Sequence, residues 1–161
     1  MEYRFLASPI GDLLLAGDKS GLRLIGFPSG KGRILPGDSW IRNDAALGDA
    51  ARQLEEYFAG NRTTFDLELS PTGTPFQLAV LDALQAIPFG QTRTYAEVAA
   101  AIGRPKAVRA VGAANGRNPL PIVIPCHRVI GTNGSLTGFG GGIETKRFLL
   151  ALESGGLPLA N

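Results

Sequence analysis

Cysteine and histidine each occur only once in this chain of 161 residues, side by side as Cys126 and His127. A single cysteine excludes an internal disulfide framework. One cysteine and one histidine also cannot complete the four-ligand set of a structural zinc site. We therefore expect no metal, and we predict no other cofactor. A free thiol is best suited to a reducing compartment, which predicts a cytoplasmic protein.

Long apolar runs and a large excess of charge are also lacking. The first residues do not form the apolar core of a signal peptide, and no later run approaches the length that spans a membrane. We therefore predict no membrane partner. The net charge of +2 is too small to indicate nucleic acid from bulk electrostatics. The length suffices for one packed domain or two small lobes.

Short apolar runs separated by turn residues predict a strand-rich first half. An antiparallel meander is expected at residues 3–7, 13–16 and 22–27. A surface loop, a helix and a further strand are predicted to follow at residues 28–38, 46–57 and 63–69. Turn residues at 70–73 then indicate a linker. We predict two domains, 1–70 and 71–161, in an α+β fold.

The second domain is predicted to be mostly helical. Its helices are expected at residues 75–87, 94–102, 104–114 and 144–153. Thr74 is a candidate N-cap, and Thr94 with Glu97 fits a capping box. The second and third of these helices, joined by a tight glycine turn, have the outline of a helix-turn-helix. An apolar strand should lead into Cys126, and residues 132–134 carry a hairpin signal.

Basic residues cluster on the predicted third helix of this domain without an acidic residue among them. They are Arg104, Lys106 and Arg109, with Arg117 just beyond the helix. The small residues between them, Ala107, Ala110 and Gly112, would let the backbone approach a nucleic-acid groove while the cations meet phosphates. A solvated helix face explains the same charges equally well.

Cys126 is the candidate nucleophile, with His127 as its candidate base. A thiol attacks as a thiolate, and its ordinary pKa of about 8.5 leaves it mostly protonated at neutral pH. Neighbours on an extended segment point to opposite faces, so His127 reaches Cys126 only through a bend, which Pro125 favours, or through a water. The dipeptide alone fits a buried structural thiol better. Glu153 closes the last helix where the dipole disfavours a carboxylate, so we expect another partner for it.

Residues 73–153 together resemble the O6-alkylguanine-DNA alkyltransferases, also called methylated-DNA-protein-cysteine methyltransferases. The most specific match is Pro-Cys-His-Arg-Val at 125–129, preceded by the Arg-Ala-Val-Gly helix. The other matching segments lie at 73–77, 87–90, 94–95, 107–112, 115, 118–119 and 134–146. The match covers about half the chain, and the first seventy residues resemble the family only in their strand-rich pattern.

The resemblance implies suicidal repair of O6-alkylguanine, with O4-alkylthymine left open as a second substrate. Cys126 would accept the alkyl group in a single irreversible displacement. His127 would activate the thiol through a water, and Glu153 would orient the imidazole. Asn118 would hold the junction between the recognition helix and the active-site segment.

The resemblance also implies a monomer that binds double-stranded DNA in the minor groove and flips the damaged base out. Arg109 would fill the vacated stack, and Tyr95 would contact the flipped nucleotide. Base contacts would come from the carbonyls of Cys126 and Val129 and from the Gly140 amide, beside the apolar wall of Phe139. The remaining DNA-side positions are Thr94, Ala107, Ala110 and Gly112.

Three positions depart from the usual family pattern. Leu81 replaces a common tryptophan, which should affect packing and not chemistry. Phe139 replaces a common tyrosine and so lacks a hydroxyl. Gly140 replaces a frequent serine, which leaves only its amide to contact O6.

Three other protein classes compete with this interpretation. Alkyltransferase-like proteins mark alkylated bases but replace the acceptor cysteine, which is present here. A cysteine hydrolase built on Cys126, His127 and Glu153 would turn over and would need no basic helix. An adaptive-response regulator would need a further acceptor domain with more cysteines. We therefore predict direct alkyl transfer to Cys126.

Overall fold

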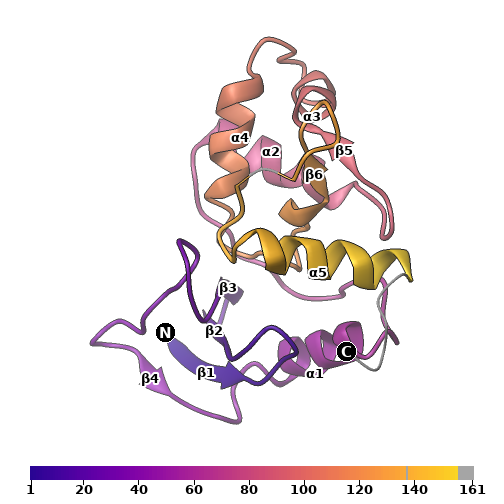
Figure 1. The fold of residues 1–161 in the computed structure, drawn as a ribbon. Helices are drawn as coiled ribbons and strands as arrows, with labels where there is room; N and C mark the ends of the chain where they lie inside the picture. The colour runs from indigo at the N-terminus through magenta and orange to yellow at the C-terminus, as the bar shows by residue number, and fades with distance from the viewer. Residues whose placement is uncertain (137, 156–161) are drawn as a thin grey trace.

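A four-stranded sheet forms the N-terminal part of the computed structural model, which describes residues 1–136 and 138–155 (Figure 1). Its order is β3-β2-β1-β4. The strands are β1 (Glu2–Leu6), β2 (Leu13–Asp18), β3 (Gly21–Gly26) and β4 (Ile41–Arg42). The first three make the predicted antiparallel meander, whereas β4 lies parallel to β1 and was not predicted. Two residues are too few to show a strand periodicity.

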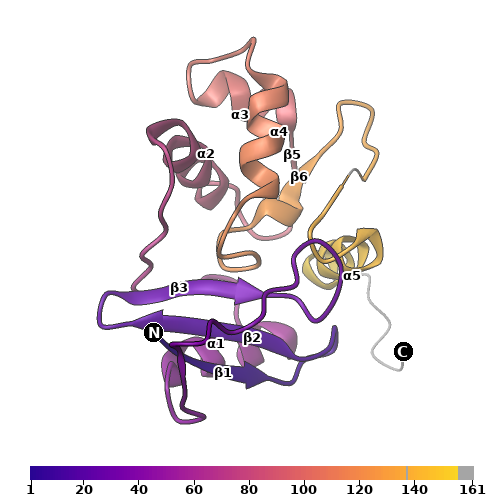
Figure 2. The ribbon, with the colours of Figure 1, turned by 90° about the vertical axis from the view of Figure 1, so that its left-hand side faces the viewer.

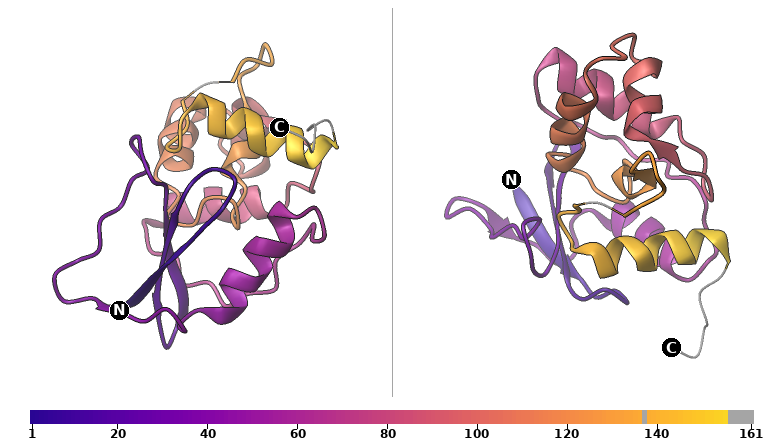
Figure 3. Two further views of the ribbon diagram at one scale, coloured as in Figure 1. Left: turned by 60° about the horizontal axis from the view of Figure 1, so that its bottom comes forward. Right: turned by 45° about the horizontal axis from the view of Figure 1, so that its top comes forward.

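One helix, α1 (Gly48–Phe58), covers one face of this sheet, and the loop that contains residues 28–38 runs along the opposite side (Figure 3). The buried face of α1 carries Leu54 and Tyr57, which belong to the same hydrophobic cluster as the strand residue Leu15. That cluster continues into the helical part of the chain, so the two parts share one core.

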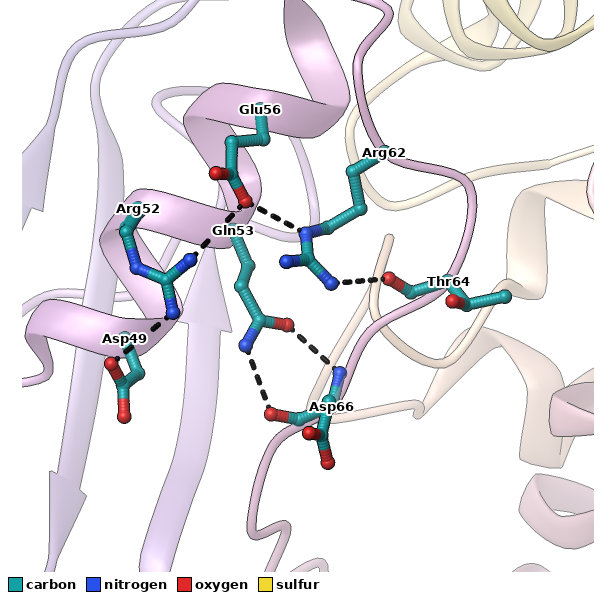
Figure 4. Close-up of polar contacts among 7 residues, drawn as sticks. All are labelled: Asp49, Arg52, Gln53, Glu56, Arg62, Thr64 and Asp66. Atoms are coloured by element: carbon teal, nitrogen blue, oxygen red, sulfur yellow. Dashed lines mark hydrogen bonds and ion pairs between the residues drawn. The ribbon is translucent and has the colours of Figure 1, made fainter.

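The predicted strand over residues 63–69 is wrong. The buried Gln53 side chain takes both backbone groups of Asp66, donating to its carbonyl oxygen at 2.9 Å and accepting from its N–H at 2.8 Å (Figure 4). Only the end of the segment meets the sheet, where the Leu22 N–H donates to the Glu68 carbonyl at 3.0 Å. The Gln53 side-chain amide therefore satisfies the backbone groups that a neighbouring strand would have paired with, had the alternating apolar residues at 63–69 formed the predicted strand.

Three helices stand above the sheet: α2 (Pro75–Gln85), α3 (Tyr95–Ala101) and α4 (Val108–Gly116) (Figure 2). Both predicted N-caps are confirmed, and each forms a full capping box, Thr74 with Gln77 and Thr94 with Glu97. The pair α3 and α4 confirms the helix-turn-helix. However, α4 begins four residues later than predicted, because the Arg104 N–H still closes α3 on the Ala99 carbonyl.

The remaining elements are two short strands, a 3-10 turn and the last helix. They are β5 (Arg93–Thr94), the 3-10 turn η1 (Cys126–Arg128), β6 (Val129–Ile130) and α5 (Ile143–Ser154). Figures 1 and 2 both place α5 at the boundary between the two parts of the chain. The signal at 132–134 forms a tight chain reversal: the Gly134 N–H donates to the Gly131 carbonyl at 2.8 Å, the Gly131 N–H donates to the Ser135 carbonyl at 2.9 Å, and Gly134 has a positive φ of 81°. The reversal is not extended into a strand pair, and β6 pairs in parallel with β5.

The fold class is α+β, as predicted. Among residues 1–136 and 138–155, no helix has the length and apolar character needed to cross a membrane. The predicted second domain extends to residue 161, and its last six residues lie outside those that the structure describes.

Candidate active site

A sharp backbone bend, and not the predicted strand, delivers Cys126. Ile122 has a positive φ of 76°, and Pro125 adopts φ −80° and ψ 66°, the geometry of an inverse γ-turn. The Cys126 N–H closes that turn on the Ile124 carbonyl at 2.7 Å. Asn118 supports the bend from the end of α4, donating to the Ile124 carbonyl at 2.7 Å and accepting from the Leu120 N–H at 2.9 Å.

Cys126 is a buried thiol at the wall of a cavity of about 260 Å³. Burial raises the pKa of the thiol to about 11, although the Asn118 hydrogen bond and the Lys146 charge act in the opposite direction. At neutral pH the thiol is therefore protonated and needs a base before it can attack. The cavity is also lined by Phe27, Lys31, Asn115, Asn118, Phe139 and Gly140.

His127 lies behind Cys126 and is fully buried. Its Nε2 atom lies 2.6 Å from Glu153 Oε2. Burial lowers the pKa of His127, and the charges of Arg128 and Lys146 lower it further, whereas Glu153 raises it. The imidazole is therefore neutral, and the carboxylate assigns its proton to Nε2. Nδ1 is then an unprotonated acceptor, and it is buried with no hydrogen-bond partner among the described residues.

Glu153 is the centre of a buried charge network. Its Oε1 accepts from Arg128 Nε at 2.7 Å, and its Oε2 accepts from Arg128 Nη2 at 3.0 Å and from the Tyr57 hydroxyl at 2.6 Å. Burial by itself would raise the pKa of Glu153, but the hydrogen bonds from His127, Arg128 and Tyr57 outweigh it and hold the pKa at about 2. The predicted need for a partner at this helix end is therefore met by four donated hydrogen bonds.

A second buried cation, Lys146, acts electrostatically on Cys126. Lys146 is fully buried on α5, and its Nζ donates to the Val129 carbonyl at 2.6 Å and lies 6.0 Å from the centre of the Tyr95 ring. Burial lowers the pKa of Lys146, and the nearby Cys126 raises it. The Val129 carbonyl, predicted to face the base, therefore already accepts a hydrogen bond.

The predicted DNA-side residues gather on α3 and α4. Arg109 and Ala110 are exposed, and Ala107 and Gly112 are half-buried. Thr94 caps α3, and the Tyr95 ring lies 3.9 Å from the position of a Cβ added to Gly112. Arg104 and Lys106 precede α4, so the predicted basic helix carries only Arg109 in its first turn. Leu81 is buried in α2, as expected of a packing residue.

The glycine loop that contains Gly140 is held by the N-terminal part. The Gly32 N–H donates to the Gly140 carbonyl at 2.7 Å, and the Phe27 and Phe139 rings meet edge to face at 5.4 Å. The structure thus brings Cys126, Asn118, Phe139 and Gly140 to one cavity, with His127 and Glu153 behind it.

Three site residues were not predicted from the sequence: Tyr57, Arg128 and Lys146. Tyr57 lies on the buried face of α1, and nothing in the sequence around it indicates a hydrogen bond to Glu153, 96 positions away. A signal for Lys146 does exist, because its position on α5 is three residues before the buried Leu149, on the inward face of the helix.

Known proteins match both parts of the chain. Residues 1–71 match the ribonuclease-like domain of 6-O-methylguanine DNA methyltransferase, and residues 75–155 match its DNA-binding domain. A methylated-DNA-protein-cysteine methyltransferase of Methanosarcina acetivorans is 55% identical over 95% of this chain and 98% of its own. The constitutive protein of that name from Bacillus subtilis is 45% identical over 94% of each chain.

Among solved structures, Mycobacterium tuberculosis OGT in complex with DNA aligns with a TM-score of 0.92 at 48% identity, over 99% of this chain and 96% of the other. The similarity therefore extends over the sheet as well as the helices. The chain belongs to the 6-O-methylguanine DNA methyltransferase family.

Proposed function

We propose that this protein is a methylated-DNA-protein-cysteine methyltransferase that repairs O6-alkylguanine by transferring the alkyl group to Cys126. The observation that carries the proposal is the arrangement behind the thiol. A neutral, buried His127 presents an Nδ1 that has no hydrogen-bond partner in residues 1–136 and 138–155, while its Nε2 is held by the ionised Glu153. This is a nucleophile, a base and an orienting group in one site, as nucleophilic catalysis requires.

The reaction is one displacement at a saturated carbon. The Cys126 sulfur forms a bond to the alkyl carbon as the bond from that carbon to O6 breaks. The thiol proton passes to His127 Nδ1 through a water. The departing guanine anion takes one proton from solvent, and His127 returns one proton to solvent, so charge and atoms balance. The product thioether is not hydrolysed, and each molecule therefore reacts once. The base is essential because burial holds the pKa of the thiol at about 11.

For binding, we propose minor-groove docking of duplex DNA through α4, with the damaged nucleotide flipped into the cavity beside Cys126. Flipping costs a few kcal/mol, and a poorly paired alkylguanine reduces that cost. The small Ala107, Ala110 and Gly112 would permit close backbone approach, and Arg109 would fill the vacated stack. Tyr95, Val129, Phe139 and Gly140 would contact the flipped base, beside Thr94 at the cap of α3.

Three broader features complete the proposal. Residues 1–70 and 71–161 would be two domains that share a core. The protein would act as a monomer, because one chain supplies every group named above. It would work in the reducing cytoplasm, where Cys126 stays a free thiol.

Intact-protein mass after mixing with excess duplex DNA that carries one O6-methylguanine tests the proposal, with Cys126→Ser as the control. The expected result is a gain of one methyl group that saturates at one per protein and is absent from the variant. Lesion-selective binding without a mass gain would instead indicate a damage-recognition protein. Release of more than one product per protein would indicate a hydrolase.

The charge of Arg109 is expected to matter for DNA binding. Arg109→Glu should weaken binding to the lesion duplex by about tenfold or more at moderate salt, because one phosphate-attracting cation becomes an anion. Lys19→Glu is the matched charge reversal, since Lys19 is exposed in the β2–β3 turn, away from α4. Titration of a labelled duplex measures both affinities. Equal losses in the two variants would contradict a DNA surface on α4.

A further inference from the structure

We propose that Tyr57, on α1 in the N-terminal part, is a positioning residue for alkyl transfer: its hydroxyl shares Glu153 Oε2 with His127 and so sets how tightly Glu153 holds the His127 proton. The inference rests on the proposed function, because His127 is the base there. It assigns to the N-terminal sheet-and-helix part a direct effect on the chemistry at Cys126.

The Tyr57 ring is buried and packed against three other aromatic rings. Tyr57 is 1% exposed, and its ring contacts Phe58, Phe65 and Phe89 at centroid distances of 5.3, 5.5 and 6.3 Å. The hydroxyl donates to Glu153 Oε2 at 2.6 Å, a short distance typical of a bond to a charged acceptor. The ring therefore aims the hydroxyl at the carboxylate.

Glu153 Oε2 is shared among three donors. It receives Tyr57 Oη and His127 Nε2, each at 2.6 Å, and Arg128 Nη2 at 3.0 Å. Donors on one oxygen compete for its negative charge, so each weakens the hold of that oxygen on the others. Without the phenol hydroxyl, more of the charge would act on His127. The imidazolium form would then be stabilised, and His127 would become protonated at higher pH.

The charges around the pair support this direction. The charged and titratable groups that act on His127 and Glu153 are Tyr57 from α1, Arg128 from η1 and Lys146 from α5. Burial and the Glu153 charge raise the pKa of Tyr57, so the phenol keeps its proton and acts as a donor at all working pH values. Tyr57 therefore lowers the basicity of the carboxylate toward His127 without adding a charge of its own.

His127 is the only histidine in the chain, so its titration can be followed by NMR of histidine-labelled protein without assignment. Tyr57→Phe keeps the ring and removes the hydroxyl. We expect the His127 midpoint to rise by about half to one pH unit. In the pH profile of the single-turnover alkyl-transfer rate, the midpoint of the acid limb should move to higher pH by the same amount. Phe65→Leu is the control, because it loosens the ring packing and leaves the hydroxyl in place.

Incorporation of 3-fluorotyrosine at position 57 gives a change of opposite sign. Its hydroxyl is a stronger donor of nearly the same shape, so the His127 midpoint should fall below that of the unsubstituted protein. Midpoints that stay unchanged in both Tyr57 variants would overturn the proposal and leave Tyr57 a packing residue. If Tyr57→Phe does not fold, the fluorotyrosine result decides alone. The midpoint needs no alkyl transfer, so it is independent of the mass test of the proposed function.

Discussion

Glu153→Gln is expected to slow alkyl transfer by about 10²- to 10⁴-fold and to lower the free energy of unfolding by about 3–5 kcal/mol. Both effects come from one substitution because Glu153 neutralises the buried Arg128 and also orients His127. Arg128 is 6% exposed, so the loss of its counter-charge leaves a guanidinium that water cannot solvate.

The amide also conflicts with its neighbours in either orientation. At the Oε1 position its NH₂ would face the Arg128 Nε–H, and at the Oε2 position it would face the Arg128 Nη2 hydrogens as well as the Tyr57 hydroxyl. In the second orientation the amide can donate to His127 Nε2, which moves the imidazole proton to Nδ1. His127 then has no acceptor for the Cys126 proton.

Glu97→Gln is the matched control for this substitution. Glu97 is exposed and accepts from the Thr94 N–H in a capping box, a position that glutamine also fills. We expect stability and rate to stay close to the unsubstituted values in that variant. Denaturant unfolding gives the stability change, and rapid-quench single-turnover reaction, carried out where each variant is folded, gives the rate. A Glu153→Gln protein that reacts at the normal rate would contradict the role of His127 as base.

Secondary structure could be predicted from the sequence wherever it depends on residues that are close together in the chain. Thr74 and Thr94 cap their helices because each finds its partner three residues later. The meander follows from alternation and turn residues. The strand predicted at 63–69 fails because the backbone of this segment is hydrogen-bonded by the Gln53 side chain, more than ten positions away. Nothing in either stretch marks that pairing.

The same difference between near and distant partners in the chain explains which site residues were foreseen. Cys126 and His127 are adjacent, and the resemblance supplied Glu153 and Asn118 with their roles. Tyr57 belongs to the part of the chain where the resemblance was only loose, and its contact to Glu153 exists only once α1 and α5 are packed together. The N-terminal part thus reaches the site through the Tyr57 hydroxyl, the Phe27 ring and the Gly32 amide, and Lys31 also lines the cavity.

The free energy of unfolding is expected to be largest between about pH 7 and pH 9 and to fall on both sides. On the acid side, the folded-state pKa of Glu153 is about 2 against an ordinary value of 4.5. A carboxylate with a lowered pKa stabilises the fold fully above its unfolded pKa, and this contribution, about 3 kcal/mol, is lost as pH falls from 4.5 toward 2.

His127 adds to the acid loss. Its folded-state pKa is lowered by burial, so below about pH 6.5 the unfolded chain binds a proton that the folded chain refuses. As pH falls from neutrality, the free energy of unfolding therefore decreases, first because His127 is protonated in the unfolded chain and then because Glu153 is.

On the alkaline side, Cys126 is the first source of the loss, and Tyr57 adds to it above pH 10, because burial raises the pKa of the phenol above its ordinary value of 10.0. The pKa of Cys126 is raised by burial from 9.0 to about 11, so the unfolded chain releases the thiol proton first. A raised thiol pKa stabilises the fold fully below pH 9, and this contribution, about 3 kcal/mol, disappears as pH rises to 11. Lys146 offsets part of it, because its lowered pKa makes the unfolded chain the better proton binder up to its ordinary value of 10.5.

Denaturant unfolding at a series of pH values checks both limbs, with Cys126→Ser as the matched variant. Serine does not titrate in this range, so the fall above pH 9 should be smaller in the variant, whereas the acid limb should keep its shape. Curves of the same shape above pH 9 would mean that the thiol is not the group that titrates there. A flat acid limb in both proteins would mean that Glu153 is not held ionised by its four donated hydrogen bonds, and the base assigned to Cys126 would then lack its orienting carboxylate.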